Sequence, residues 1–231
     1  MEFGLKGRHV ALLAADGVDG RQLGGPRQVL GDAGVVADVL AARTGEIRGS
    51  GGESVTVDRT FETCRAADYD ALVIPGGRQA VDALRADQRA LQFVKEFMAA
   101  DKPVVAIGDG VKLLVAADTV AGRAIAAKSD LADDVRNGGG RLVDAEVHVD
   151  DTLITSPGGD DLGALNAAML REFSNRVDEA RVDQLSEQSF PASDPPPGPV
   201  AVGGEGASTA QRRDHRGGGS ERGSPDSRAR P

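Results

Sequence analysis

Aromatic residues are scarce in this chain: its 231 residues include six phenylalanines, one tyrosine and no tryptophan, which is 3% in total. A hydrophobic core must therefore be built mainly from small aliphatic side chains. Alanine, valine and leucine suit helices that pack closely against a parallel sheet. The composition thus favours an α/β fold.

The chain has a single cysteine, Cys64. An intramolecular disulfide is therefore excluded, and a zinc site built from cysteines is disfavoured. Cys64 comes shortly after a predicted strand, and not at a turn between a strand and a helix, so we interpret it as an incidental thiol. We expect no metal and no cofactor.

Long apolar runs are absent from the sequence. A helix that spans a bilayer needs about 20 predominantly apolar residues, and no run approaches that length. The apolar stretch near the amino end is also too short for a convincing signal peptide. We therefore expect a cytoplasmic protein that does not bind membranes.

Positive charge is in deficit, because the formal net charge is −9 at pH 7. Binding to nucleic acids or to anionic membranes needs clustered lysines and arginines. An acidic chain of this kind is not expected to have a nucleic-acid partner. Its length allows one domain with a full core and an appendage.

Apolar β-prone runs alternate with segments of helical periodicity along the first three quarters of the chain. This alternation predicts a three-layer, flavodoxin-like α/β sandwich with a mostly parallel sheet. A glycine-rich excursion between two of the strands predicts a hairpin at residues 43–61. The predicted strands are 9–14, 35–41, 70–75, 104–107, 123–128, 145–149 and 153–155. One predicted helix ends near residue 34, another begins near residue 111, and the others cover 86–100, 131–137 and 160–173.

The pattern indicates one folded domain, residues 1–173, followed by an appendage. Residues 174–189 either extend the last helix or act as a linker. Residues 190–231 are rich in proline, glycine, serine and arginine and cannot bury enough apolar surface to order themselves. They are predicted to form a disordered tail.

The stretch VVAIGDGVKLL, residues 104–114, predicts a buried strand that enters a helix through a tight turn. Many α/β enzymes carry a nucleophile on a strained residue at such a turn. Here the turn holds Gly108 and Asp109. We expect Gly108 to adopt the strained backbone conformation at no steric cost, and Asp109 to cap the helix that begins near Val111.

The order of VALLAADGVDG, YDALVIPGG, KPVVAIGDGVKLL and DDVRNGGGRLVDAEVHVDDTLITSPGGDDLGAL resembles the PfpI-like family over residues 7–173. That family includes intracellular proteases, stress-protein deglycases and relatives of the Parkinsonism-associated protein. The resemblance implies the flavodoxin-like fold shared with class I glutamine amidotransferases. Within the family, ADGVDG, ALQFVKEF and AIGDGVKLL look most like the C-terminal domain of large-subunit catalases.

Active members of the family carry A-I-C-H-G at the turn, with a cysteine nucleophile and a neighbouring histidine. The resemblance places Gly108 at the position of the cysteine and Asp109 at that of the histidine. It also places the carboxylate that contacts the cysteine near Asp19, and the carboxylate that orients the histidine near Asp82. These four residues mark a degenerate site, and none of them is assigned a catalytic role.

Our leading interpretation is a catalytically silent PfpI-like domain that acts in oligomerisation, stability or the oxidative-stress response. Its partners would be copies of itself and a catalase. The chain is too short to hold a haem-binding catalase domain as well, so no catalase activity is expected.

Two alternatives stay open at this point. The first is a hydrolase or deglycase in which Asp19, Asp82 and Asp109 converge to share a proton or bind a hard cation. The second is a stress sensor whose pocket binds a small molecule without reacting.

Overall fold

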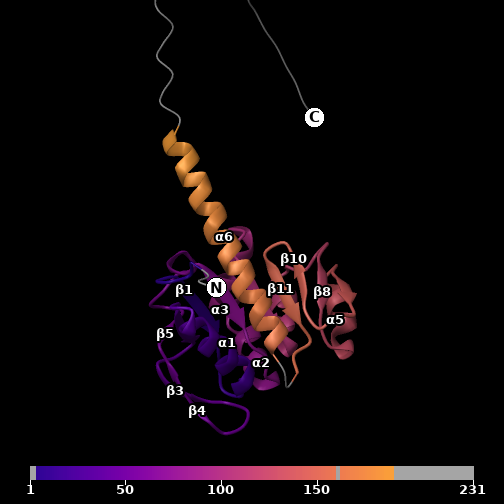
Figure 1. The fold of residues 1–231 in the computed structure, drawn as a ribbon. Coiled ribbons are helices and arrows are strands. Elements are labelled where there is room, and N and C mark those ends of the chain that lie inside the picture. The colour runs from indigo at the N-terminus through magenta and orange to yellow at the C-terminus, as the bar shows by residue number, and fades with distance from the viewer. Residues whose placement is uncertain (1–3, 160–161, 190–231) are drawn as a thin grey trace, which may run out of the picture. The chain divides into compact units, whose positions relative to one another are not determined.

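The computed structural model describes residues 4–159 and 162–189. A seven-stranded sheet with the order β10-β11-β7-β6-β1-β2-β5 forms its centre (Figure 1). All neighbouring pairs in this sheet are parallel except β10 and β11, which run antiparallel. The strands are β1 (His9–Leu13), β2 (Val36–Ala41), β5 (Arg59–Thr60), β6 (Ala71–Ile74), β7 (Val104–Ile107), β10 (His148–Asp150) and β11 (Leu153–Ser156).

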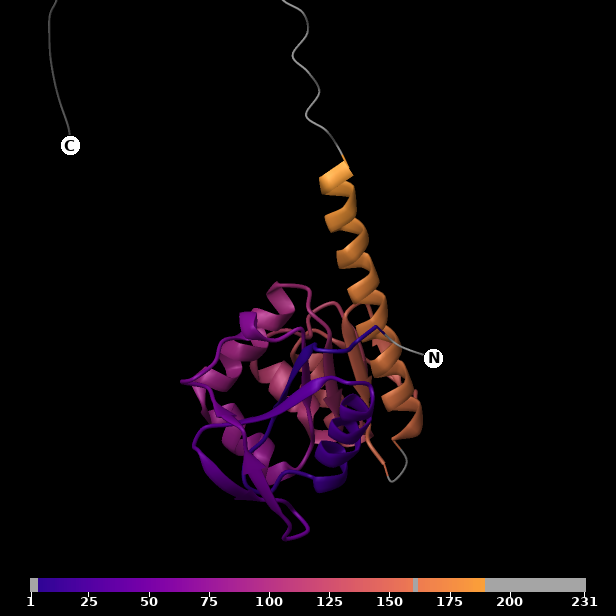
Figure 2. The same cartoon turned by 60° about the vertical axis from the view of Figure 1, so that its left-hand side comes forward.

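The central strands are buried on both faces, as their continuous apolar runs predicted. Successive side chains of a strand point to opposite faces, so Ala11 and Leu13 join one core cluster while Val10 and Leu12 join the other. Helices α3 and α4 complete the first cluster, and α1 and α6 complete the second (Figure 2). The predicted three-layer sandwich with a mostly parallel sheet is therefore confirmed.

Six α-helices occur in the described part of the chain. Helix α3 begins at Gln88 because the Asp87 side chain accepts a hydrogen bond from the Arg89 backbone N–H. The last helix continues well past Phe173, so residues 174–189 extend it. The helices are α1 (Gly20–Asp32), α2 (Arg78–Ala86), α3 (Gln88–Ala99), α4 (Val111–Ala116), α5 (Ala132–Asn137) and α6 (Gly163–Ser189).

The predicted hairpin forms from β3 (Gly45–Arg48) and β4 (Ser54–Val57), which pair antiparallel. Its tip is tied to the loop after β1, because the Ser50 N–H donates to the Val18 carbonyl at 2.8 Å. The hairpin therefore lies against the loop that leads into α1.

Helix α2 and strands β5 and β9 were not predicted from the sequence. Strand β5 comes directly after the hairpin and pairs with β2 at the edge of the central sheet. Helix α2 follows the Gly76–Gly77 turn at once and buries Ala80, Val81 and Leu84 against the core. Strand β9 (Arg141–Val143) pairs with β8 (Ala124–Ala126) in a small separate sheet, outside the central one. The predicted tail, residues 190–231, lies outside the described residues. Where the chain is described, none of its helices has the length and hydropathy of a bilayer span.

The turn after β6 packs backbone to backbone on the loop after β1. The Asp19 N–H donates to the Gly76 carbonyl at 3.0 Å. Gly77 has a φ of 110°, and a β-carbon there would fall on the Gly17 carbonyl oxygen. Only glycine satisfies both demands, so this residue fixes how closely the two loops approach.

We expect Gly77→Ala to lower the free energy of unfolding by about 2 kcal/mol or more, because it adds both backbone strain and a steric clash. Urea unfolding measures this change. Gly24→Ala is the matched control, since Gly24 lies within α1 and a β-carbon there meets nothing within 4 Å. That variant should be stabilised by about 0.5–1 kcal/mol. Equal effects of the two substitutions would contradict the close packing at Gly77.

Candidate functional site

The turn between β7 and α4 is the predicted elbow. Gly108 is buried and has a φ of 54°, a backbone conformation that side-chain-bearing residues rarely adopt. The expectation that glycine takes the strained position is confirmed. Gly108–Gly110 wind as a short 3-10 turn, η2, and lead directly into α4. The elbow therefore keeps its backbone form while it offers no side chain that could act as a nucleophile.

The side chain that faces the elbow is that of Gln22, from the first turn of α1. Gln22 is only 6% exposed. Its Oε1 accepts a hydrogen bond from the Gly76 backbone N–H at 2.9 Å, and its Nε2 lies 3.3 Å from Asp19 Oδ2. A β-carbon built on Gly108 would lie 3.4 Å from Gln22 Oε1. The carboxamide thus fills the space between the Gly76–Gly77 turn and the elbow.

In this arrangement Gln22 occupies the backbone N–H donor of Gly76. Backbone N–H groups beside an elbow stabilise negative charge on a reacting oxygen when they are available to it. The Gly76 N–H already donates to Gln22 Oε1. On the other side, the Pro157 carbonyl oxygen would lie 3.4 Å from a β-carbon on Gly108. The elbow is therefore lined by an amide and a carbonyl, neither of which is a strong base or nucleophile.

Asp19 caps α1 and does not face the elbow directly. Its Oδ1 accepts hydrogen bonds from the backbone N–H groups of Arg21, at 3.0 Å, and Gln22, at 3.2 Å. These bonds satisfy two of the free N–H groups at the helix start. Asp19 reaches the elbow only through the side chain of Gln22. The resemblance placed a carboxylate, that of Asp19, beside the elbow. In the structure the side chain beside the elbow is instead the amide of Gln22, three residues further along the chain.

Asp109 does not cap a helix, and the capping prediction is wrong. No side-chain capping bond forms at the start of η2 or of α4. The reason is that Gly110 is already helical and the Val111 N–H donates to carbonyls of the 3-10 turn, so α4 has no separate start to cap. Asp109 Oδ1 instead lies 3.5 Å from Lys112 Nζ, and its side chain is 16% exposed.

Asp82 lies on α2 with its side chain 59% exposed, and its Oδ1 is 3.6 Å from Arg85 NH1. Within residues 4–159 and 162–189 it forms no hydrogen bond or ion pair with Asp19 or Asp109. The same part of the chain holds no group of three histidine, cysteine or acidic side chains arranged to bind a metal ion. The carboxylates that the sequence suggested are therefore used separately, in a cap and in two ion pairs.

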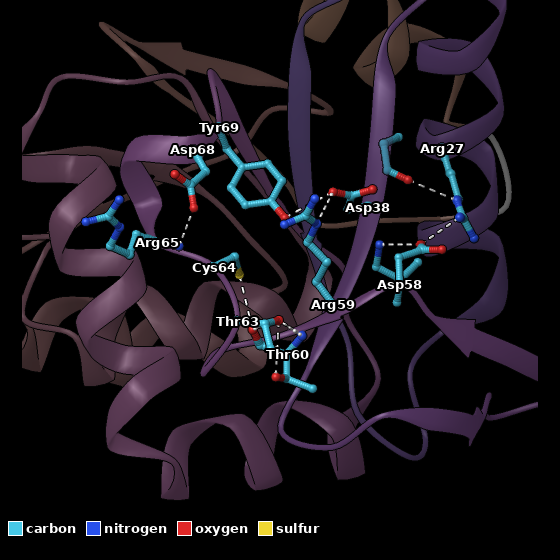
Figure 3. Close-up of polar contacts among 12 residues, drawn as sticks. Arg27, Asp38, Asp58, Arg59, Thr60, Thr63, Cys64, Arg65, Asp68 and Tyr69 are labelled. Atoms are coloured by element: carbon cyan, nitrogen blue, oxygen red, sulfur yellow. Dashed lines mark hydrogen bonds and ion pairs between the residues drawn. The ribbon is translucent and has the colours of Figure 1, made fainter.

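Cys64 belongs to a different cluster, between β5 and β6 (Figure 3). Its thiol is buried and donates to the Thr60 carbonyl at 3.2 Å. The nearby Tyr69 hydroxyl donates to Asp38 Oδ2 at 3.1 Å, and Arg59 Nε lies 3.4 Å from the same oxygen. Burial raises the pKa of the Cys64 thiol. A thiol in this state is a poor nucleophile, which agrees with its interpretation as an incidental residue.

Fold and elbow together place this chain among flavodoxin-like α/β domains whose site lies at a strand-to-helix turn. The chain belongs to the DJ-1/PfpI family, whose model matches residues 8–172. Protein/nucleic acid deglycase 2 of Escherichia coli is 36% identical over 71% of this chain and 96% of its own length. General stress protein 18 of Bacillus subtilis is 39% identical over 63% of this chain and 86% of its own.

Solved structures support the same assignment. A two-domain protein from Anabaena variabilis, with DJ-1/ThiJ/PfpI-like and ferritin-like domains, superposes with a TM-score of 0.69 at 31% identity. The match covers 74% of this chain and 48% of that protein, so this chain spans about half of its length. DJ-1 of Schizosaccharomyces pombe, at 22% identity and a TM-score of 0.59 over 79% of this chain and all of its own, shares the fold.

Sequence reasoning missed Gln22, although a signal for it exists. Asp19 and Gln22 have the spacing of a capping box, in which a glutamine at the third helical position reaches back toward the N-cap residue. Recognition of that spacing would have predicted that Gln22 lies beside Asp19. It would not have predicted the bond to Gly76, which joins residues 54 positions apart.

We expect Gln22→Leu to lower the free energy of unfolding by about 1–3 kcal/mol, because it leaves the buried Gly76 N–H without an acceptor. Chemical denaturation measures the loss. Gln92→Leu is the control, since Gln92 is exposed on α3 and bonds only to exposed Glu96 among the described residues. A Gln22 variant as stable as the Gln92 variant would contradict the bridging role of the amide.

We expect the Cys64 thiol of the folded protein to react with an aromatic disulfide reagent at pH 8 at least about tenfold more slowly than in the urea-unfolded chain. Burial hinders access, and the raised pKa lowers the thiolate fraction. The absorbance of the released thiolate follows the reaction. The rate should rise with pH throughout the alkaline range. Equal rates in the folded and unfolded chains would show that Cys64 is accessible and ionised.

Proposed function

We propose that this protein is a catalytically silent member of the DJ-1/PfpI family that acts through binding and association. The observation that carries the proposal is the closed elbow: Gly108 has no nucleophile, and Gln22 occupies the space in front of it. Covalent chemistry of the kind that a cysteine supplies needs an activated nucleophile and a base. Gly108 and Gln22 supply neither group, and the Asp109 carboxylate is paired with Lys112.

The stress response is the setting that we propose for this role. The relatives described above carry the names of one deglycase and of a general stress protein. Self-association is the mode of action that we favour, in stability or in assembly with other chains. Within residues 4–159 and 162–176, Val36, at 43% exposure, is the one large hydrophobic side chain that stands exposed. An interface between copies would therefore be largely polar on this part of the surface. Association with a catalase stays a prediction, and none of the relatives described above is one.

A deglycase that uses carboxylates instead of cysteine is the competing function. It requires acidic side chains positioned on one substrate. Asp19 is engaged in capping α1, and Asp82 is paired with Arg85 on the exposed side of α2. Asp109 lies closest to the elbow in sequence but is paired with Lys112. These separate engagements favour the silent domain.

We expect the purified protein to show no turnover of methylglyoxal-modified amino acids, of methylglyoxal itself or of peptides above a protein-free blank. A Gly108→Cys, Asp109→His variant, and the same variant with Gln22→Glu, should show turnover at least about tenfold above the blank, because they restore a nucleophile and basic groups. Each is assayed from matched preparations.

Cys64→Ser is the control in every background, because it removes the remaining thiol of the wild type. Turnover by the wild type that survives Cys64→Ser would contradict the proposal. Loss of that turnover on Asp109→Asn would then assign it to the carboxylate and establish the competing function.

A further inference from the structure

A hollow of about 550 Å³ lies beside the elbow region, between the loop after β1, the β3–β4 hairpin and the start of α2. Its size suits a small metabolite. Arg48 and Arg78 line it from opposite elements, together with Ser50 and Gln79. It shares no lining residue with the contacts that Gln22 makes at Gly76 and Gly108. The hollow is thus a second candidate site, independent of any chemistry at the elbow.

Arg48 is held firmly at its backbone. Its N–H donates to Asp16 Oδ1 at 2.8 Å, and its carbonyl accepts from the Gly17 N–H at 2.7 Å. These two bonds fix the end of β3 against the loop after β1. The side chain therefore extends from a fixed base, which lowers the entropy that it loses when it binds a ligand.

The acidic residue that lines the hollow, Asp16, already has partners for both of its carboxylate oxygens. Its Oδ2 lies 2.9 Å from Arg43 NH2, and its Oδ1 accepts the Arg48 N–H. The hydrogen bond from the Arg48 backbone, followed by that from the Arg43 side chain, lowers the pKa of Asp16. Asp16 is therefore ionised at neutral pH, and the charge of Arg43 compensates it.

The two guanidinium groups at the hollow have no direct partner, although the charge of Arg48 adds to that of Arg43 in lowering the pKa of Asp16. Neither the Arg48 nor the Arg78 side chain forms an ion pair or a hydrogen bond with any residue in the part of the chain that the structure describes. Arg78 is also the first residue of α2, whose N-cap, Gly77, supplies no side-chain acceptor. The positive end of the α2 dipole adds to the potential of the two arginines.

One further carboxylate lies close by. The Glu53 side chain packs against Gly49 and Gly20, and lines a neighbouring hollow with Asp19 and Arg21. It stands on the α1 side of the hairpin tip. Glu53 does not line the hollow of Arg48 and Arg78, although its carboxylate lies against Gly49 at the edge of that hollow.

We propose that this hollow binds the carboxylate or phosphate group of a small metabolite. Arginine presents planar pairs of N–H donors that match both groups, and such charge-assisted bonds are the strong ones. The rest of the protein disfavours anions, because its net charge is −9. Two arginine side chains without a direct partner, at one hollow of an acidic protein, therefore mark a specific anion site. Ser50 and Gln79 add neutral hydrogen-bonding groups that select among ligands.

Isothermal titration of the full-length protein tests the site, with inorganic phosphate and with citrate as separate probes in a low-salt buffer. We expect saturable binding of at least one probe. The Arg48→Gln, Arg78→Gln double variant should bind it at least about tenfold more weakly, because it removes both charged donors. Binding of phosphate alone assigns a phosphate ligand, and binding of citrate alone assigns a carboxylate ligand.

Arg141→Gln is the matched control. Arg141 is exposed at the start of β9 and forms no ion pair with the described residues, so its removal changes net charge without touching the hollow. The affinity of the Arg141→Gln variant for the bound probe should stay within about twofold of that of the wild type. Circular dichroism verifies that all variants fold. The proposal is overturned if neither probe binds at about 10 mM, or if the control loses as much affinity as the double variant.

Discussion

The bond between Gln22 and the Gly76 N–H is the constraint on which the site depends. It joins the first turn of α1 to the turn after β6, and it holds the carboxamide against the elbow after β7. The parallel strands β1, β6 and β7 end at the same edge of the sheet. The loops that follow them can meet only if their backbones approach closely. Gly77 allows that approach, and the Asp19 cap orients the helix that carries Gln22. Because the amide is buried, loss of its partner would leave an unsatisfied polar group, and the arrangement is fixed for that reason.

The same constraint separates this protein from a cysteine-based enzyme. A reacting oxygen at the elbow would need the donor that Gln22 already occupies and a nucleophile that Gly108 does not have. We propose that this edge of the sheet binds a ligand instead. The hairpin is tied to the loop after β1 through Ser50 and Arg48, and this places Arg48 at the hollow that Arg78 lines from the start of α2. In this proposal the edge of the sheet binds an anionic ligand and catalyses no reaction.

The sequence predicted the fold more completely than the site. The buried strands of the central sheet were found because their apolar runs are local signals, whereas the two-residue edge strand β5 has no such run and was missed. Gly108 was expected at the strained position because that conformation depends on the residue's own backbone. Asp109 was misjudged, since its role depends on how η2 joins α4. Gln22 was missed because its partner, Gly76, is distant in sequence. Helix α2 was missed for a related reason: its short apolar face gains stability from packing on the core and not from a long periodic pattern.

Hydrogen exchange of the Gly76 amide, followed by NMR in the wild type and in a Gln22→Leu variant, tests the closed elbow most directly. If Gln22 Oε1 accepts this N–H, the amide exchanges slowly in the wild type. It exchanges at least about tenfold faster in the variant under conditions where neighbouring strand amides keep their protection. Fast exchange in the wild type, or equal protection in both proteins, would contradict the account, because the donor would then be open or held by another group.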